Sequence, residues 1–157
     1  MIEIERKFLV NSPAFKTEAD KSTRVIQGFL NTDKARTVRV RVMGEQGFIT
    51  VKGISSKDGL SRFEWEKRIC KTDAEALLDL CEEGVIDKIR YEINFDDKIF
   101  EVDEFFGANE GLIVAEIELS HEAESFVKPD WLGREVTGDV KYYNSQLSKK
   151  PFKTWEL

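Results

Sequence analysis

Polar and apolar residues alternate along most of this chain, and the alternation predicts eight β-strands. Side chains two residues apart share one face of a strand, so a period of two is typical of a strand with one buried face. The eight stretches cover residues 2–10, 24–32, 36–43, 47–53, 61–70, 87–95, 98–106 and 112–120. Turn-forming residues separate several of them, and Asp96-Asp97 between two alternating runs is typical of a tight hairpin.

Few helices are expected between and after these strands. One is indicated by an apolar stripe at helical spacing, formed by Ala74, Leu77, Leu78 and Cys81. Thr72 or Asp73 is expected to cap this helix and Gly84 to end it. Shorter helices are predicted at 121–127 and 139–149. Consecutive strands with helices added outside are typical of an α+β protein, and we expect one domain over residues 1–157.

The polar faces of the predicted strands are almost entirely ionised, which a sheet facing water does not require. On the first strand Glu3, Glu5 and Lys7 share one face. Similar sets recur on most other strands and include Arg39, Arg41, Lys52, Arg62, Glu64, Glu66, Lys88, Arg90, Glu101, Asp103, Glu116 and Glu118. On a single strand, the ordinary interpretation is a solvated surface with cross-strand ion pairs worth about 0.2–1 kcal/mol each. Repetition along the chain favours a closed barrel whose charged faces point inward.

The interior of such a barrel is predicted to be wet and to contain ions. Eight strands leave room for side chains and one small ligand, and unpaired charges in a dry interior cost several kcal/mol each. Neighbouring carboxylates such as Glu3 and Glu5 repel one another unless a cation lies between them, and their oxygens suit Mg²⁺ or Mn²⁺. Arginine forks and lysine ammonium groups suit phosphate oxygens. The pattern therefore predicts divalent cations together with a polyanion.

Composition narrows the chemistry further. The net charge of −6 argues against a nucleic-acid scaffold, and no apolar run approaches the ~20 residues of a membrane span. The chain is therefore expected to be cytoplasmic. His121 is the only histidine, which excludes His-based triads and multi-His metal sites, and Cys70 and Cys81 lack metal-ligand spacing. Catalysis is expected to use carboxylates, lysines, arginines or a metal ion.

The ordered motifs resemble those of the CYTH domain family, also called the triphosphate tunnel metalloenzymes. Glu3-Ile4-Glu5-Arg6-Lys7 is similar to the ExExK motif of that family, and the similarity continues along essentially the whole chain. The further motifs are Thr37-Val38-Arg39-Val40-Arg41, Thr50-Val51-Lys52, Ser61-Arg62-Phe63-Glu64-Trp65-Glu66, Lys88-Ile89-Arg90-Tyr91, Glu101-Val102-Asp103, Glu116-Ile117-Glu118, Glu135-Val136-Thr137 and Tyr142-Tyr143-Asn144. The resemblance implies a closed eight-stranded antiparallel β-barrel that forms a tunnel, with helices packed outside.

The resemblance also implies roles for individual residues. Metal-binding positions are matched by Glu3, Glu5, Glu116 and Glu118, with Glu64, Glu66, Glu101 and Asp103 as further metal or water-orienting groups. Phosphate-binding positions are assigned to Lys7, Arg39, Arg41, Lys52, Arg62 and Arg90, with Lys141 as a further contact at the tunnel mouth. Lys88, near the attacking water, is expected to act in catalysis with Glu5 and Glu118. The implied cofactors are two Mg²⁺ or Mn²⁺ ions.

The activity implied is hydrolysis of a small-molecule triphosphate. Tripolyphosphate is the expected substrate, because so short a chain has little sequence for recognising an organic group. An adenylyl cyclase of the CYTH type, or a thiamine triphosphatase, is the enzymatic alternative; Trp131 and Tyr142 offer rings for stacking but are expected to pack. A non-catalytic polyphosphate- or nucleotide-binding module is a further alternative, which the many carboxylates disfavour. No nucleic-acid or membrane partner is expected, and the chain is predicted to be a monomer or a homodimer.

Overall fold

The computed structural model describes residues 2–155 and is built around one antiparallel sheet of nine strands. The strands are β1 Ile2–Val10, β2 Lys21–Asn31, β3 Arg36–Met43, β4 Gln46–Ser55, β5 Ser61–Ile69, β6 Ile86–Phe95, β7 Lys98–Phe105, β8 Ile113–Glu118 and β9 Leu132–Glu135. The α-helices are α1 Phe15–Glu18, α2 Lys71–Leu78 and α3 Asn144–Leu147, and the 3₁₀ helices are η1 Gly107–Asn109, η2 Val140–Tyr142 and η3 Phe152–Thr154. Within this part of the chain, no helix is long and apolar enough to cross a membrane.

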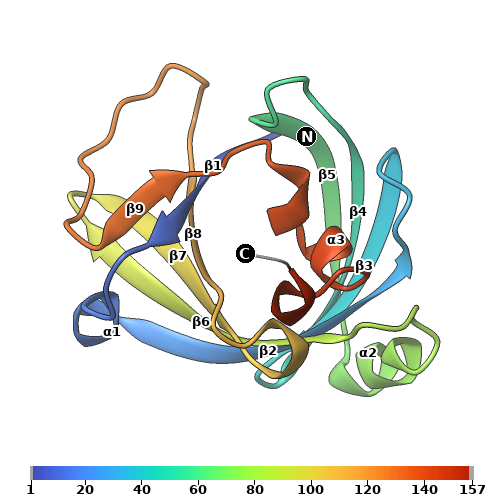
Figure 1. Cartoon of the computed structure of the whole chain (residues 1–157). Helices are drawn as coiled ribbons and strands as arrows, with labels where there is room; N and C mark the ends of the chain where they lie inside the picture. The colour runs from blue at the N-terminus through green and yellow to red at the C-terminus, as the bar shows by residue number, and fades with distance from the viewer. Residues whose placement is uncertain (1, 156–157) are drawn as a thin grey trace.

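The sheet closes into a barrel, as the charge pattern predicts (Figure 1). The strand order is β5-β4-β3-β2-β6-β7-β8-β1, and β1 also pairs with β5. Closure depends on the first residues of β1, where Ile2 lies opposite Phe63 and Ile4 opposite Ser61. The rest of β1 pairs with β8 along one edge and with the extra strand β9 along the other, beyond the residues that pair with β5. The predicted eight-stranded barrel is confirmed, with one strand added.

The hairpin predicted at Asp96-Asp97 is confirmed. Both residues have positive φ, 50° and 61°, and Phe95 pairs with Lys98 across the turn. A two-residue turn with positive φ at both positions matches the right-handed twist of the flanking strands, and aspartate tolerates this conformation better than most residues. The turn therefore sets the register that brings β6 and β7 side by side.

Several predictions outside the barrel are wrong. Residues 121–127 form a turn and then irregular chain, not a helix, and the Phe126 ring in this segment packs on the rings of Phe8 and Phe100. Residues 132–135 form β9, which was not predicted. The helix expected to end at Gly84 is shorter, ending at Leu78, and its cap position is Cys70, without a side-chain cap. Residues 139–149 divide into η2 and α3.

The larger apolar core lies on the outer surface of the barrel. The even-numbered residues of β1 and β7 and the outward-facing residues of β8 pack against α1 and β9. The cluster consists of Phe8, Phe15, Ile93, Phe100, Val102, Ala115, Ile117, Leu119, Trp131 and Leu132. Trp131 is 1% exposed and packs edge-on against Phe15 and Phe100, so it is a core residue. Burying one face of each strand here leaves the alternate face for the interior.

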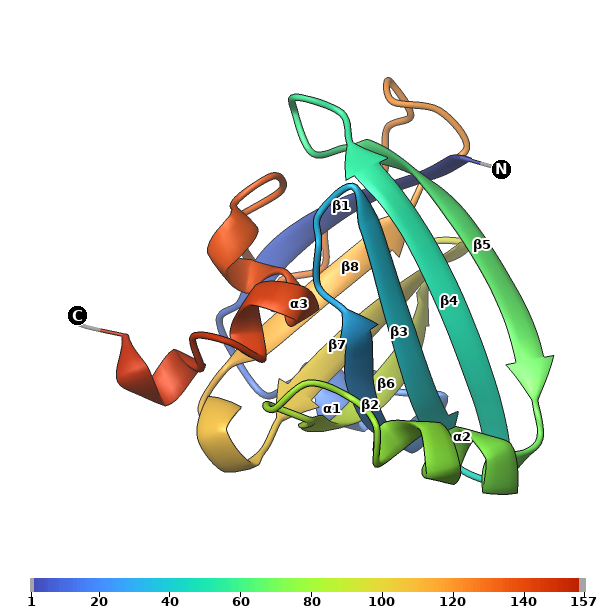
Figure 2. The same cartoon turned by 90° about the vertical axis from the view of Figure 1, so that its right-hand side faces the viewer.

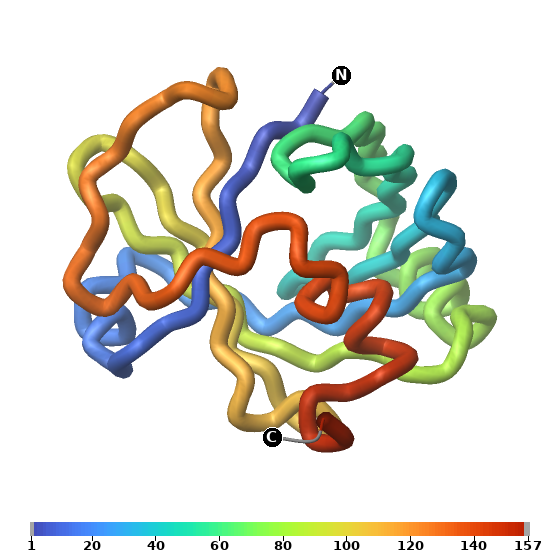
Figure 3. Tube along the Cα trace, turned by 45° about the horizontal axis from the view of Figure 1, so that its top comes forward, coloured from blue at the N-terminus to red at the C-terminus, as the bar shows by residue number. Residues whose placement is uncertain are grey.

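A second apolar cluster fills one end of the barrel. Inward-facing positions become apolar there, and the C-terminal segment packs on them; the cluster is Phe29, Ile86, Phe105, Leu112, Val114, Val136, Tyr142 and Leu147. Figures 1 and 3 show the C-terminal segment, in red, lying across the opening, and Figure 2 shows α3 at that end in side view. The interior is thus apolar at this end and charged beyond it. We call residues 136–155 the end segment.

Candidate active site

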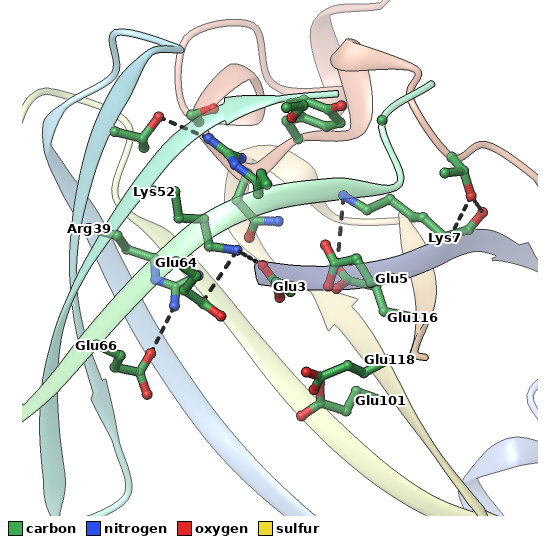
Figure 4. A pocket seen from close by; sticks show the side chains of 18 of the residues that line it. Glu3, Glu5, Lys7, Arg39, Lys52, Glu64, Glu66, Glu101, Glu116 and Glu118 are labelled. Atoms are coloured by element: carbon green, nitrogen blue, oxygen red, sulfur yellow. Dashed lines mark hydrogen bonds and ion pairs between the residues drawn. The ribbon is translucent and has the colours of Figure 1, made fainter. Parts of the chain in front are cut away.

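The charged interior faces surround a cavity of about 270 Å³ (Figure 4). Strand alternation brings together nearly all the site residues predicted from the sequence. Those that line the cavity are Glu3, Glu5, Lys7, Arg39, Arg41, Lys52, Arg62, Glu64, Glu66, Lys88, Arg90, Glu101, Glu116 and Glu118. Asp103 and Lys141 do not line it.

The arginines of β3 present open guanidinium groups to the cavity. Arg39 donates to Thr50 Oγ1 at 3.1 Å, and the Nη2 atoms of Arg39 and Arg41 lie 3.5 and 3.6 Å from Glu66 Oε2. The Nε atoms of both arginines are buried without a hydrogen-bond partner among the described residues. Burial lowers the pKa of both groups, and neighbouring positive charges lower it further. These groups are therefore available to an anion that enters the cavity.

The cations of β6 are paired instead. Arg90 donates two hydrogen bonds to Asp103, from Nε at 2.8 Å and from Nη2 at 2.9 Å, and a third to Glu101 at 3.3 Å. Lys88 Nζ donates to Asp103 Oδ2 at 2.7 Å. Burial raises the pKa of Asp103, but the charges of Arg90 and Lys88 outweigh it and hold that pKa well below its usual range. The Asp103 carboxylate is therefore already paired with these two cations, which argues against the metal-binding role predicted for it.

Carboxylates from β1 and β8 crowd together deep in the cavity. Burial raises the pKa of Glu5, and the charges of Glu116 and Glu3 raise it further. Burial also raises the pKa of Glu116, but the Lys7 ammonium, 3.8 Å away, and a hydrogen bond from Glu5 lower it below its ordinary value. The raised pKa of Glu5 thus reflects repulsion between buried carboxylates, which a bound cation would relieve.

A second group of carboxylates lies toward the open side, where Figure 4 shows Glu101 beside Glu118. Burial raises the pKa of Glu118, and the charges of Glu3 and Glu64 add to the effect. Burial likewise raises the pKa of Glu101. Lys52 balances part of this charge, with its Nζ 3.0 Å from Glu3 Oε2 and 3.6 Å from Glu64 Oε1.

The donor set of this cavity fits a hard divalent cation. Within residues 2–155, no three aspartate, glutamate, histidine or cysteine side chains already converge into a complete metal site. Mg²⁺ does not require such a cage, because it is commonly held by one or two carboxylates, with phosphate oxygens and waters completing the octahedron. Glu5 and Glu116, which both line the cavity and raise or lower one another's pKa, provide such a pair.

Some cavity residues were not assigned a role from the sequence. Thr37, Thr137, Tyr143, Asn144 and Ser145 line the cavity together with Gly59 and Gly138. Five of these come from the end segment, where no strand period reveals which side chains point inward. Thr37, Thr137, Tyr143 and Asn144 fall within the family-like motifs of the sequence, which gave them no individual role.

Two glycines join the end segment to the β4–β5 hairpin at the cavity rim. Gly59 and Gly138 have φ of +77° and +79°, and a Cβ on Gly59 would lie 2.3 Å from Gly138 Cα. Neither position has room for a side chain, and both conformations favour glycine. The rim is therefore closed by direct backbone packing.

The sequence and the fold both match known proteins. The CYTH domain model matches residues 1–149. An inorganic triphosphatase of Acetivibrio thermocellus is 50% identical over 155 residues, which cover 98% of this chain and 97% of that protein. An inorganic triphosphatase of Nitrosomonas europaea is 38% identical over 152 residues, covering 94% and 97%. A crystal structure of an inorganic triphosphatase superposes with a TM-score of 0.65 at 34% identity, covering 93% of this chain and 97% of that one. The chain belongs to the CYTH domain family.

Proposed function

We propose that this chain is a metal-dependent triphosphatase that hydrolyses inorganic triphosphate. The observation that carries the proposal is 50% identity to an inorganic triphosphatase over nearly the full length of both chains. The cavity supports it independently, because its walls combine two arginine Nε donors that have no hydrogen-bond partner among the described residues with Glu5, a buried carboxylate whose pKa neighbouring acids raise. A metal–triphosphate complex would satisfy both groups.

The carboxylates Glu3, Glu5, Glu116 and Glu118 would hold the divalent cations, which we take to be two Mg²⁺ or Mn²⁺ ions. When bound, these ions supply Lewis acidity and offset the charge on phosphate oxygens. The need for metal agrees with the metal dependence of the CYTH triphosphatases. Glu64, Glu66 and Glu101, nearer the open side, would orient water around the bound complex.

The basic side chains would bind the substrate oxygens. Arg39 and Arg41 offer planar forks, and Lys7, Lys52 and Arg62 extend the positive wall toward β1 and β5. These contacts would hold the phosphates in a fixed position, so that binding energy is used to align them for in-line attack. Lys88 faces the cavity while fixed from behind by Asp103, so its ammonium is placed to stabilise charge that develops at the reacting phosphate.

The lining of the cavity favours an inorganic substrate over a nucleotide. Pockets for drug-sized organic ligands are typically mostly apolar. This cavity is lined mainly by charged side chains, and its aromatic lining residues among the described ones are Phe29 and Tyr143. Trp131 and Tyr142 are buried in the two apolar clusters, so neither is free to stack on a base. This disfavours an adenylyl cyclase or a thiamine triphosphatase.

A substrate panel tests the proposal. Phosphate release should be fastest from tripolyphosphate, compared with ATP, thiamine triphosphate and pyrophosphate, with Mg²⁺ or Mn²⁺ present. Glu5→Gln should abolish it, because an amide cannot replace the buried carboxylate as a metal ligand. Glu104→Gln is the matched control, since Glu104 lies on the outer face of β7, hydrogen-bonded to Lys16. Undiminished turnover by Glu5→Gln would contradict the mechanism, and cyclic AMP formed from ATP would indicate a cyclase.

A further inference from the structure

One side-chain oxygen joins three separate parts of the molecule at the inner end of the cavity. Asn144 is the first residue of α3, and its Oδ1 accepts hydrogen bonds from Gln27 Nε2 at 2.7 Å and from Lys88 Nζ at 3.1 Å. Gln27, on β2, is fully buried, and Lys88, on β6, is 1% exposed. The end segment therefore reaches the barrel wall through Asn144, at the boundary between the apolar end and the charged cavity.

The direction of the Lys88 ammonium follows from the number of its donors. An ammonium group has three N–H bonds. One is donated to Asp103 Oδ2 at 2.7 Å and one to Asn144 Oδ1. The third has no hydrogen-bond acceptor among the described residues, and Lys88 lines the cavity. With Asp103 alone, the ammonium would be free to rotate about a single contact, whereas two fixed acceptors determine where the third hydrogen points.

We propose that Asn144 is a positioning residue, which orients Lys88 toward the substrate and is itself held by Gln27. The part of this inference that concerns rate rests on the proposed triphosphatase activity. The geometric part, that Asn144 fixes the Lys88 ammonium, stands without it.

A purely structural role for Asn144 is disfavoured by its surroundings. The cap position of α3 is Tyr143, and no side chain caps this helix. The end segment is anchored by other contacts, since Tyr142 and Leu147 are buried in the apolar cluster and Tyr142 packs on Trp155. Removing the Asn144 amide should therefore leave the segment docked.

Kinetics of tripolyphosphate hydrolysis test the rate effect. Asn144→Ala should lower kcat by about 10- to 100-fold while KM changes by less than about threefold, because a displacement of roughly 1 Å at a reacting group costs about that much. Gln146→Ala is the control, an amide on the same helix that does not line the cavity. In a Lys88→Met background, Asn144→Ala should cause no further loss, since a residue that acts through Lys88 has nothing left to orient.

A spectroscopic measurement tests the geometry without activity. In protein labelled with ¹⁵N-lysine, the Lys88 ammonium signal is assigned by its absence in Lys88→Met. It should be retained in Gln146→Ala and be shifted or broadened in Asn144→Ala. Gln27→Met should move it in the same direction by less, which provides a second variant if Asn144→Ala folds poorly.

The two measurements separate the possible failures. If wild-type protein releases no phosphate from tripolyphosphate, the proposed function fails, and the ammonium signal still decides the positioning role. If wild-type protein is active but Asn144→Ala matches it in kcat and in the Lys88 signal, the positioning role is overturned. Additive losses in the double variant would likewise overturn it, because they would mean that Asn144 acts independently of Lys88.

Discussion

Two pairs of cations face the same cavity from neighbouring parts of the barrel, and they differ in how closely carboxylates contact them. Arg39 and Arg41 on β3 share weak contacts of 3.5 and 3.6 Å with Glu66, and their Nε atoms have no partner among the described residues. Lys88 and Arg90 on β6 are bound to Asp103 at 2.7–2.9 Å.

We call Arg39 and Arg41 on β3 the binding wall, and Lys88 and Arg90 with their partner Asp103 the supporting wall. The two β3 guanidinium groups repel one another, and their Nε donors have no hydrogen-bond partner among the described residues. A bound anion can therefore supply acceptors that the fold does not. Cations that already share a carboxylate contribute to stability and gain less from a ligand. We therefore expect substitutions on β3 to cost activity and substitution of Asp103, the carboxylate shared by the β6 cations, to cost stability.

The largest expected effect is on stability, at the centre of the supporting wall. Asp103→Asn removes the charge that compensates both Lys88 and Arg90, and breaking a buried ion pair costs about 3–5 kcal/mol. Urea denaturation followed by circular dichroism measures this loss. Glu104→Gln, one residue along on the outer face, removes a partly exposed pair with Lys16 and should cost less than about 1 kcal/mol. Equal losses for the two variants would remove the distinction between the walls.

On the binding wall, Arg41→Gln should lower kcat/KM for tripolyphosphate by about 100- to 1,000-fold, the usual consequence of removing one preorganised electrostatic contact. The free energy of unfolding should stay the same or rise, because the variant removes a buried charge that Arg39 and Arg90 repel. Steady-state phosphate release and urea denaturation on the same samples measure both. A variant that loses stability and activity together would place Arg41 in the supporting wall.

The pH dependence should have opposite signs for activity and stability at Lys88. Burial and the charge of Arg90 lower the pKa of Lys88 to about 8, against the opposing effects of Asp103 and Glu116. Above pH 8 the ammonium is lost, so kcat/KM should fall, by up to about tenfold per pH unit. The unfolded chain keeps its proton up to about pH 10.4, so over the same range the folded state binds fewer protons, and the contribution of Lys88 to stability rises with pH.

Comparison with Lys88→Met from pH 7 to pH 10 isolates both contributions. The variant should lack the fall in kcat/KM that begins near pH 8. The stability difference between wild type and variant should shift in favour of wild type as the pH rises. A parallel fall of activity and stability in wild type would instead indicate general unfolding.

Much of this arrangement was predictable, because a period of two fixes which face a strand residue occupies. Glu3 and Glu5 had to share a face, and repetition of that pattern indicated the barrel. How deeply a side chain lies beneath its neighbours on that face was not predictable. Asp103 shares its face with Glu101, yet it lies behind Lys88 and Arg90, because those two longer side chains reach over it from β6.

The end segment was the least predictable part of the site. Its short helices lack a long apolar period, and their inward side depends on how they dock against the barrel. Asn144 belongs to a motif of the sequence, but its contacts are visible only in the structure, where β2 and β6 supply its partners. The same reason explains why Lys141, expected at the phosphates, lies elsewhere.

Substitution of Lys141 has the smallest expected effect on activity, and this cation belongs to neither wall. Its ammonium lies 4.9 Å from the Trp155 ring centre and 5.3 Å from that of Tyr142, outside the cavity. Lys141→Ala should change kcat/KM by less than about threefold, and high salt should remove the difference, because exposed charges act only through the screened field. Lys7→Ala, which removes an ammonium buried beside Glu116, should cost far more and remain costly in high salt. A comparable, salt-resistant loss in Lys141→Ala would mean that this side chain enters the cavity with the substrate, and the binding wall would then extend into the end segment.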